Sequence, residues 1–311
     1  MHPAYSVIIF TTASGAGYGL LALLGLVGFN HGPASNFWFG LASLLIGLGL
    51  VTIGLLSSTL HLGHPERAWR AFSQWRSSWL SREGVAAVIT YVPILAFGLV
   101  WLNLVERPDL IGPLGIASLA GAAITVFCTA KIYSSLKTIR AWANPFTVPV
   151  YLVYALATGA TLLMAIASVF DRWQPFQAYL AAFMLVGTIV LKFLYWRSID
   201  GAERTHTIGD ATGLGRIGAV RQWEVPHTAQ NFVMKEMGYS VARRHAQRLR
   251  LMVYALLAAS LLLTLLTLVA LPIVFSVLAA LAAFVSAVIQ RWLFFAEAQH
   301  VVSLYYGAQK A

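Results

Sequence analysis

Long apolar runs alternate with shorter polar segments along the whole chain. Each run is long enough to cross a bilayer as a helix, which takes about 20 residues. The runs are solidly apolar, whereas the strands of a membrane barrel alternate between apolar and polar positions. The pattern therefore predicts an all-α polytopic membrane protein, a bundle of eight transmembrane helices. The predicted spans are Tyr5–Phe29, Phe37–Leu60, Val85–Val105, Ile111–Leu136, Val148–Phe170, Ala178–Trp196, Leu251–Leu271 and Ile273–Ile289.

The boundary between the last two predicted spans is the least marked, because residues 251–289 form one apolar block. As a single helix this block would measure about 58 Å, at 1.5 Å per residue, whereas the bilayer core is about 30 Å thick. The block must therefore turn. Pro272 is the residue within it that breaks a helix, so we expect the turn there.

The composition agrees with a membrane protein. Of the 311 residues, 59% are hydrophobic and 10% are charged, whereas soluble domains carry about 25% charged residues. The net charge of +10 would suit a nucleic-acid partner, but in a membrane protein positive charge reports topology. We therefore expect membrane lipid, and no nucleic acid, around the chain. No polar segment is long enough for a large core of its own, so residues 1–311 are predicted to form a single membrane anchor domain.

Positive charge is concentrated on one side of this layout. With eight spans, both termini and the segments after the second, fourth and sixth spans share a side. Of the 21 lysines and arginines, all except Arg107 and Arg172 fall on that side. By the positive-inside rule, both termini are predicted to be cytoplasmic.

The most polar junction joins the second span to the third, in the segments Thr59–Ala68 and Ser81–Gly84. His61 and His64 follow the second span, and Glu83 opens the third on the same side. A neutral imidazole can hydrogen-bond a quinone carbonyl, and a carboxylate can take the proton that a quinol releases. Polar chemistry at the edge of a membrane helix is costly to keep, so it indicates a working site. The alternatives are an interfacial histidine and simple capping by Glu83, since a helix N-terminus favours an anion.

Lys131 and Tyr133 lie near the cytoplasmic end of the fourth span. Tyr133 could donate a hydrogen bond to a quinone oxygen. A lysine at this depth can equally extend to the interface, and tyrosine is common in the aromatic belts of membrane proteins. The sequence leaves both interpretations open.

Other redox groups fit the chain poorly. None of the eight histidines lies in the middle of a predicted span, so two facing axial ligands for haem are missing. The single cysteine, Cys128, cannot hold an iron–sulfur cluster, which takes about four thiolates. His61 and His64 lack the further ligands of a metal site. We expect no haem, no iron–sulfur cluster and no metal on this chain.

The longest polar segment, residues 197–250, is predicted to be a cytoplasmic loop that forms a docking face for soluble subunits. Simple positive-inside anchoring is the alternative for its arginines. Gly213–Gly218 matches the G-x-G-x-x-G pattern of dinucleotide-binding loops, but no β-strand precedes it, so dinucleotide binding is disfavoured. The basic residues expected to contribute to docking are Arg216, Arg221, Arg243 and Arg244.

Acidic residues are nearly absent from the spans, with Glu83 and Glu297 at span ends. A proton pump or an ion-coupled carrier usually needs ionisable groups inside the membrane. Pumping and transport are therefore disfavoured.

Three motifs resemble the dimethyl-sulfoxide reductase anchor subunits (DmsC-like): His61–Ala68, Ser81–Gly84 and Lys131–Ser134. The similarity covers nearly the whole chain, including the eight-span layout. The first seven residues and the loop from Ala211 to Tyr239 look more like one branch of that family. This branch is the SoeC-like membrane subunit of cytoplasmic, quinone-dependent sulfite dehydrogenases.

The resemblance implies a membrane anchor for two soluble partners on the cytoplasmic side of the bacterial inner membrane. One partner carries iron–sulfur clusters, and the other is a catalytic subunit with a molybdopterin cofactor. Within the family, the histidine of the His-Leu-Gly motif and the acid that opens the next span are implicated in quinol binding. They correspond here to His61 and Glu83. His64 and Arg82 belong to the local pattern of this branch.

The sequence hypothesis is therefore a quinone-reactive anchor subunit of a sulfite-oxidising molybdenum enzyme, with catalytic residues on another chain. The quinone is ubiquinone or menaquinone. Two further alternatives stay open: a reductase anchor of the DMSO or polysulfide type that oxidises quinol, and a structural anchor or small-solute transporter without quinone chemistry. The expected quinone-site residues are His61, Glu83, Tyr133, Arg67, His64 and Arg82.

Overall fold

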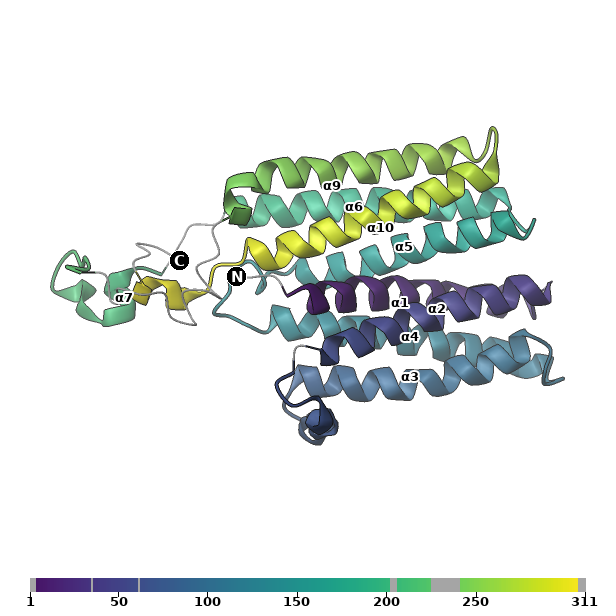
Figure 1. The fold of residues 1–311 in the computed structure, drawn as a ribbon, viewed down its shortest axis with the longest axis horizontal. Coiled ribbons are helices and arrows are strands. Elements are labelled where there is room, and N and C mark those ends of the chain that lie inside the picture. The colour runs from purple at the N-terminus through teal and green to yellow at the C-terminus, as the bar shows by residue number, and fades with distance from the viewer. Residues whose placement is uncertain (1–3, 35, 61, 202–205, 225–240, 307–311) are drawn as a thin grey trace.

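The chain folds into one layered bundle of long helices (Figure 1). The computed structural model describes residues 4–34, 36–60, 62–201, 206–224 and 241–306. Within these ranges, 8 helices are long and apolar enough to cross a membrane, which confirms the predicted all-α, eight-span architecture. They are α1 (Tyr5–His31), α2 (Phe37–Thr59), α3 (Trp79–Trp101), α4 (Ile111–Ser134), α5 (Thr147–Val169), α6 (Pro175–Asp200), α9 (Val241–Leu266) and α10 (Pro272–Ala296).

Short helices cover the ends of the bundle. Those at the end that carries both termini include the 3-10 helix η1, which follows α2 (Figure 1). The marked N- and C-termini lie at this same end, as an even number of spans requires. The short elements are η1 (Pro65–Gln74), η2 (Pro108–Leu110), α7 (Ile208–Thr212), η3 (Leu214–Arg216) and η4 (Val301–Tyr306).

Several helices extend beyond the predicted spans into polar sequence. The clearest case is α3, which begins at Trp79 rather than at the predicted Val85. Ser78 caps it, because its side chain accepts a hydrogen bond from the backbone N–H of Ser81. Hydropathy marks only the apolar part of a helix. Glu83 therefore lies inside α3 and not at its edge.

The predicted turn in the last apolar block is confirmed. Helix α9 ends at Leu266, and Pro272 is the first residue of α10, where the missing backbone N–H costs nothing. The residue before it, Leu271, has a left-handed backbone with φ of 43°. This conformation reverses the chain direction within a few residues.

Helices α1 and α5 form the centre of the bundle. In their apolar windows, 83% and 72% of the residues are buried, against 39% or less in the other spans. Figure 1 shows α1 between the α2–α3–α4 group and the group of α5, α6, α9 and α10. Glycines allow this close packing: a Cβ on Gly19 would lie 1.7 Å from the Ala155 carbonyl oxygen, and one on Gly159 would lie 2.2 Å from the Gly19 carbonyl carbon. Small residues let membrane helices approach closely.

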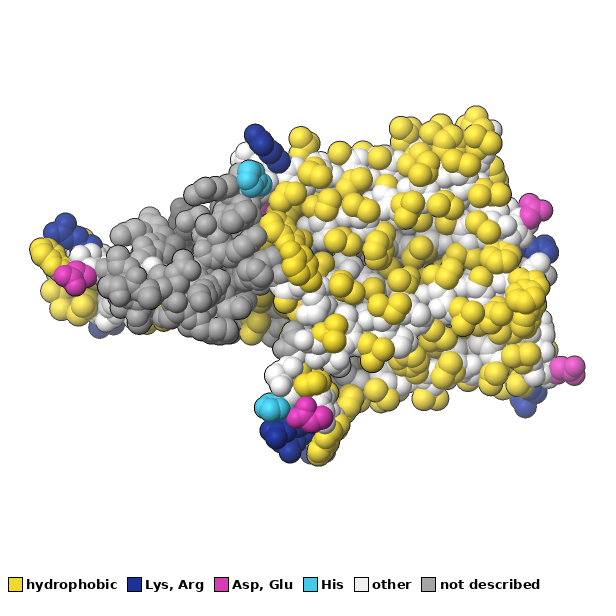
Figure 2. All heavy atoms as spheres, viewed as in Figure 1, with side chains coloured by type: hydrophobic (Ala, Val, Ile, Leu, Met, Phe, Trp, Pro, Cys, Tyr) yellow, Lys and Arg dark blue, Asp and Glu magenta, His cyan; other side chains and the backbone are white. Residues whose placement is uncertain are grey.

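The outer faces of the helices are apolar. Large hydrophobic side chains such as Phe183, Val92 and Leu56 are 71%, 69% and 62% exposed, and apolar side chains cover the body of the bundle in Figure 2. Charged side chains gather beyond its two ends. This distribution is that of a protein whose flanks face lipid.

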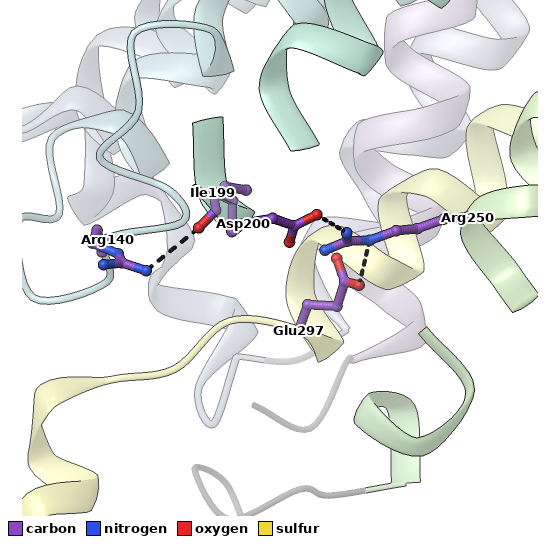
Figure 3. A network of polar contacts seen from close by, with 5 residues as sticks. All are labelled: Arg140, Ile199, Asp200, Arg250 and Glu297. Carbon is purple, nitrogen blue, oxygen red and sulfur yellow. Dashed lines mark hydrogen bonds and ion pairs between the residues drawn. The ribbon is translucent and has the colours of Figure 1, made fainter. Parts of the chain in front are cut away.

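Polar contacts join three helices at the end of the bundle that carries the termini (Figure 3). The guanidinium of Arg250, on α9, donates to Asp200 Oδ2 of α6 at 2.6 Å and to Glu297 Oε1, just after α10, at 2.9 Å. Nearby, Arg140 donates to the Ile199 carbonyl at 3.5 Å. Arg250 thus links α6, α9 and α10 in one charge-assisted network.

We expect the Arg250→Met variant to lose about 2 kcal/mol of stability, because two acceptors lose a charged donor. Arg107→Met is the matched control, since Arg107 pairs with Asp109 at 2.8 Å on an exposed surface, where ion pairs contribute little. Thermal unfolding in detergent measures both. Equal shifts in Tm would contradict a stabilising role for the Arg250 network.

Candidate functional site

Glu83 is a buried carboxylic acid one turn inside α3. It is 5% exposed, and its Oε1 accepts a hydrogen bond of 2.7 Å from the hydroxyl of Thr129 on α4. An ionisable side chain within a membrane helix is a functional-site candidate by default, because its burial is costly. The burial of Glu83 and its bond to another helix therefore support a functional role and argue against simple capping of α3.

Thr129 can serve Glu83 in both protonation states. Its hydroxyl also lies 3.1 Å from the backbone carbonyl oxygen of Thr125. A hydroxyl has one hydrogen and two lone pairs. When Glu83 is ionised, Thr129 donates to it; when Glu83 is protonated, the acid can donate to Thr129, which then donates to the Thr125 carbonyl. The pair can therefore exchange a proton without leaving a buried polar group unmatched.

A polar seam continues from this pair between α3 and α4. The hydroxyls of Thr125 and Thr90 lie 3.2 Å apart, and Thr90 is two turns further along α3 than Glu83. Both threonines are buried. The seam extends from the end of the bundle into its interior.

Tyr133 lies one turn beyond Thr129 on the same face of α4. It is 9% exposed and packs in an aromatic cluster with Trp142, Tyr151 and Phe295, at centroid distances of 5.2, 5.9 and 5.3 Å. This burial differs from a position in an interfacial aromatic belt. Its hydrogen bond to a quinone stays a prediction.

Arg82 holds η1 against the start of α3. Its guanidinium donates to the backbone carbonyls of Trp75 and Arg76 and lies 4.4 Å from the centre of the Trp79 ring. The Ser81 hydroxyl also donates to the Ala71 carbonyl. Arg82 is thus positioned by local contacts with the segment after η1 and with Trp79.

His64 and Arg67 lie on the exposed surface of η1. His64 Nδ1 and Arg67 Nε lie 3.0 and 3.6 Å from Glu66 Oε1, so both pair with this acid and not with Glu83. His61 lies outside the described residues. Of the six predicted quinone-site residues, the structure brings Glu83 and Tyr133 to one buried region, leaves Arg82 half-buried and places His64 and Arg67 on the surface.

The exposed face of η1 carries aromatic rings. Trp69, Phe72 and Trp75 are 66%, 41% and 51% exposed, and Arg70 and Arg76 lie 5.7 and 5.4 Å from the rings of their tryptophan neighbours. Tryptophan and arginine are typical of the membrane–water interface. This segment therefore suits a position beside the lipid headgroups, next to the start of α3.

The sequence did not predict that two cations, Lys192 and Arg291, are buried. Both were counted among the basic residues on the cytoplasmic side of the membrane. Lys192 is 0% and Arg291 is 4% exposed. Their cationic groups lie over aromatic rings: Lys192 Nζ is 4.0 Å from the Tyr195 ring, and Arg291 Cζ is 3.5 Å from the Tyr151 ring. Lys192 lies within the predicted span Ala178–Trp196, and this position was the sign of its burial in the sequence.

A small, partly enclosed cavity lies between α1, α4, α5 and α10. The space open to the centre of a water molecule is about 10 Å³, which suits about one water and is far below the roughly 300 Å³ of the smallest ligand pockets. A quinone ring therefore does not fit in it. Its polar lining consists of Thr11, Thr12, Ser14, Thr129, Tyr151, Tyr154, Thr158 and Arg291.

Within the long loop, residues 206–224 form short helices. Thr207 caps α7 and donates to Asp210, and this hydrogen bond lowers the pKa of the Asp210 carboxyl. Gly213 follows α7 and precedes η3, so the glycine-rich segment joins two short helices and is not the strand-to-helix turn of a dinucleotide-binding loop.

Arg216 and Arg221 are exposed in this part of the loop. The side chains of Arg243 and Arg244 lie outside the described residues. Among the residues that the structure describes, no three His, Cys, Asp or Glu side chains gather as a metal ion would require.

Comparison with known proteins places the chain among anchor subunits. The family model for the DMSO reductase anchor subunit (DmsC) matches residues 1–307. The chain is 31% identical to a subunit of sulfite dehydrogenase from Allochromatium vinosum, over 98% of this chain and 99% of that protein. It is 29% identical to the anaerobic dimethyl sulfoxide reductase chain YnfH of Escherichia coli, over 64% of this chain and 71% of that protein.

These matches agree with the observed fold. The family model covers all eight helices, and the similarity to the sulfite dehydrogenase protein extends over nearly both full lengths. This multi-pass membrane protein therefore belongs to the DMSO reductase anchor subunit family and is the membrane anchor subunit of an oxidoreductase complex.

Proposed function

We propose that this chain is the quinone-reactive anchor of a sulfite-oxidising molybdopterin enzyme. It passes electrons from an iron–sulfur partner to ubiquinone or menaquinone in the membrane. The observation that carries the proposal is the buried Glu83–Thr129 pair one turn inside the membrane helix. The near full-length similarity to a subunit of a sulfite dehydrogenase supports sulfite as the substrate of the catalytic partner.

The residues fit the chemistry of a quinone. Reduction of its ring oxygens requires protons, and Glu83 can hold and deliver a proton beside a hydroxyl that adapts to either state. The quinone would reach this region from the lipid beside η1 and α3, where His64, Arg67 and Arg82 bring polar groups to the membrane face. His61 stays a predicted member of the site. Tyr133 would support the site through its place beside Thr129 on α4.

The partners dock on the end of the bundle that carries both termini. The exposed Arg216 and Arg221 lie at that end. The chain segments that precede and follow residues 225–240 lie there as well. The excess of lysine and arginine supports a cytoplasmic location for this end, in the inner membrane of a bacterium. The loop 197–250, with Arg243 and Arg244, is then the docking face for the iron–sulfur subunit, and the molybdopterin subunit lies beyond it.

The test is sulfite-dependent quinone reduction by the purified complex of this chain with its soluble partners. We expect reduction of a short-chain quinone that stops with a quinone-site inhibitor, while reduction of a soluble artificial acceptor by the partners continues. Complexes whose quinone reduction ignores the inhibitor would favour a structural anchor. A quinol-dependent reaction without sulfite oxidation would favour a reductase anchor of the DMSO or polysulfide type.

A further inference from the structure

Arg291 is a buried cation whose hydrogen bonds are not all made. It is 4% exposed, and its Nε and Nη1 atoms have no hydrogen-bond partner among the described residues. The Tyr151 hydroxyl, beside it, also has none. A buried guanidinium or hydroxyl left without a partner costs several kcal/mol in an apolar environment, on the order of the desolvation penalty. Something other than the described side chains must complete these bonds.

The small cavity provides the place for it. Both Arg291 and Tyr151 line the cavity, together with the hydroxyls of Thr129 and Ser14. The space suits about one water, and a buried water makes about three hydrogen bonds to polar groups. The lining offers both donors and acceptors. An ordered water in this cavity therefore matches its size and its unsatisfied groups together.

Thr129 connects this cavity to Glu83. The Thr129 hydroxyl is one of the lining groups and lies 2.7 Å from Glu83 Oε1. The acid and the cation thus lie on two sides of one polar region, with a threonine and a water-sized space between them.

We propose that a water in this cavity links Arg291 to Thr129 and Glu83, and that Arg291 is a positioning residue for proton reloading of Glu83. The inference rests on the proposed quinone reaction at Glu83. Arg291 fixes the water and favours the ionised acid that has just lost its proton. It touches neither the quinone nor the reacting atoms.

The proton balance explains why reloading matters. Reduction of one quinone takes two electrons, supplied by the iron–sulfur partner, and two protons. When Glu83 delivers a proton, its O–H bond breaks and an O–H bond forms on the quinone oxygen. The Glu83 carboxylate then takes a proton through Thr129 from the cavity water, which regains one from the cytoplasmic side. Glu83 must reload in this way before it can deliver the second proton.

Several other ionisable side chains lie on the helices around this region. They come from α1, α3, α4, α5, α6 and α9 and from the residue after α10, and they include one further buried cation. They are Tyr18 on α1, Arg82 and Tyr91 on α3, Cys128 and Tyr133 on α4, Tyr151 and Tyr154 on α5, Lys192 on α6, Arg250 and Tyr254 on α9, and Glu297 after α10.

Gly15 allows a test that leaves the acid, the threonine and the cation in place. Gly15 lines the cavity, and a Cβ there would meet no atom within 4 Å. We expect Gly15→Leu to displace the water and to lower kcat for quinone reduction by the complex about tenfold, with the quinone KM within about twofold. Gly49→Leu is the matched control, because Gly49 is also a half-buried helix glycine with nothing within 4 Å of a Cβ, and it does not line the cavity.

Arg291 itself is tested by Arg291→Gln and Arg291→Lys. We expect Arg291→Gln to lower kcat about tenfold with little change in KM. Because loss of the cation favours protonated Glu83, the alkaline limb of the kcat–pH profile should move to higher pH. Arg291→Lys keeps the charge and should restore that limb. Reduction of a soluble acceptor by the partners should be unchanged in all variants, which shows that the complexes are assembled.

The inference fails if Gly15→Leu and Gly49→Leu behave alike, or if Arg291→Gln leaves the pH profile in place. These failures are distinct from failure of the proposed function. If Glu83→Gln abolishes quinone reduction while the Arg291 and Gly15 variants match the wild type, the quinone site stands and the water link is wrong. If Glu83→Gln retains wild-type turnover, the proposed function at this site is itself wrong.

Discussion

Glu83→Gln should reduce quinone-coupled turnover of the complex by about 100-fold or more, the scale of a lost general acid–base group. Glutamine has nearly the same shape, and its side-chain oxygen can still accept the hydrogen bond from Thr129. It cannot hold or deliver the proton. We therefore expect normal assembly, a normal rate with a soluble acceptor, and loss of the quinone reaction alone. Steady-state assays with the two acceptors measure both rates.

Glu106→Gln is the matched control for this variant, because Glu106 lies in the exposed turn after α3 at the other end of the bundle. It should behave as the wild type. Thr129→Val should lower turnover less than Glu83→Gln, and Thr129→Ser should retain it, since serine keeps the hydroxyl. Wild-type quinone turnover in Glu83→Gln would remove the central support for a quinone site beside α3.

Gly19→Leu should prevent folding of the bundle. A Cβ at Gly19 would lie 1.7 Å from the Ala155 carbonyl oxygen and 2.5 Å from its carbon. These are backbone atoms, so the side chain has no flexible neighbour to displace, and α1 and α5 must separate. Overpacking costs about 1–3 kcal/mol in ordinary cores and more where backbone must move. We expect little or no folded protein in detergent extracts.

Gly15→Ala is the control on the same helix, one turn earlier, where a Cβ meets nothing within 4 Å. It should give wild-type yield and Tm, because alanine also has the better helix propensity. Size-exclusion profiles and thermal unfolding of the two variants give the comparison. A folded Gly19→Leu protein with wild-type Tm would show that α1 and α5 do not touch as described.

The layout of the membrane helices could be predicted from the sequence, because the apolar runs have the length of the bilayer. The depth of Glu83 could not be predicted. By hydropathy the third span begins at Val85, which leaves Glu83 just outside it, whereas α3 begins after its cap at Ser78. The cost of burying the acid is offset by Thr129, a residue of another helix. The hydropathy of a helix does not show which side chains of another helix it contacts.

The same limit applies to the contacts of the other polar residues. His64, Arg67 and Arg82 lie close to Glu83 in sequence and were therefore expected in one site. The 3-10 helix η1 instead pairs the first two with Glu66 on the surface. Arg291 is far from Glu83 in sequence, and only the packing of α10 against α5 and α1 brings it to the cavity that Thr129, the partner of Glu83, also lines. Distance along the chain therefore does not show which polar side chains contact one another.

The glycine contact between α1 and α5 also bears on biosynthesis. Gly19 leaves the ribosome well before Ala155, and at about 5–20 residues per second the interval is on the order of ten seconds. During that time the surface of α1 around Gly19 must lie against lipid or against other helices that have already been inserted. Gly19 has no side chain, and the nearby hydroxyls of Thr11, Thr12 and Ser14 donate to backbone carbonyls of α1 itself, so these positions need no other partner while α1 waits in the bilayer. The centre of the bundle is therefore completed only after half of the protein has been inserted. Nascent chains that stop before Thr147 lack α5, the helix against which Gly19 of α1 packs.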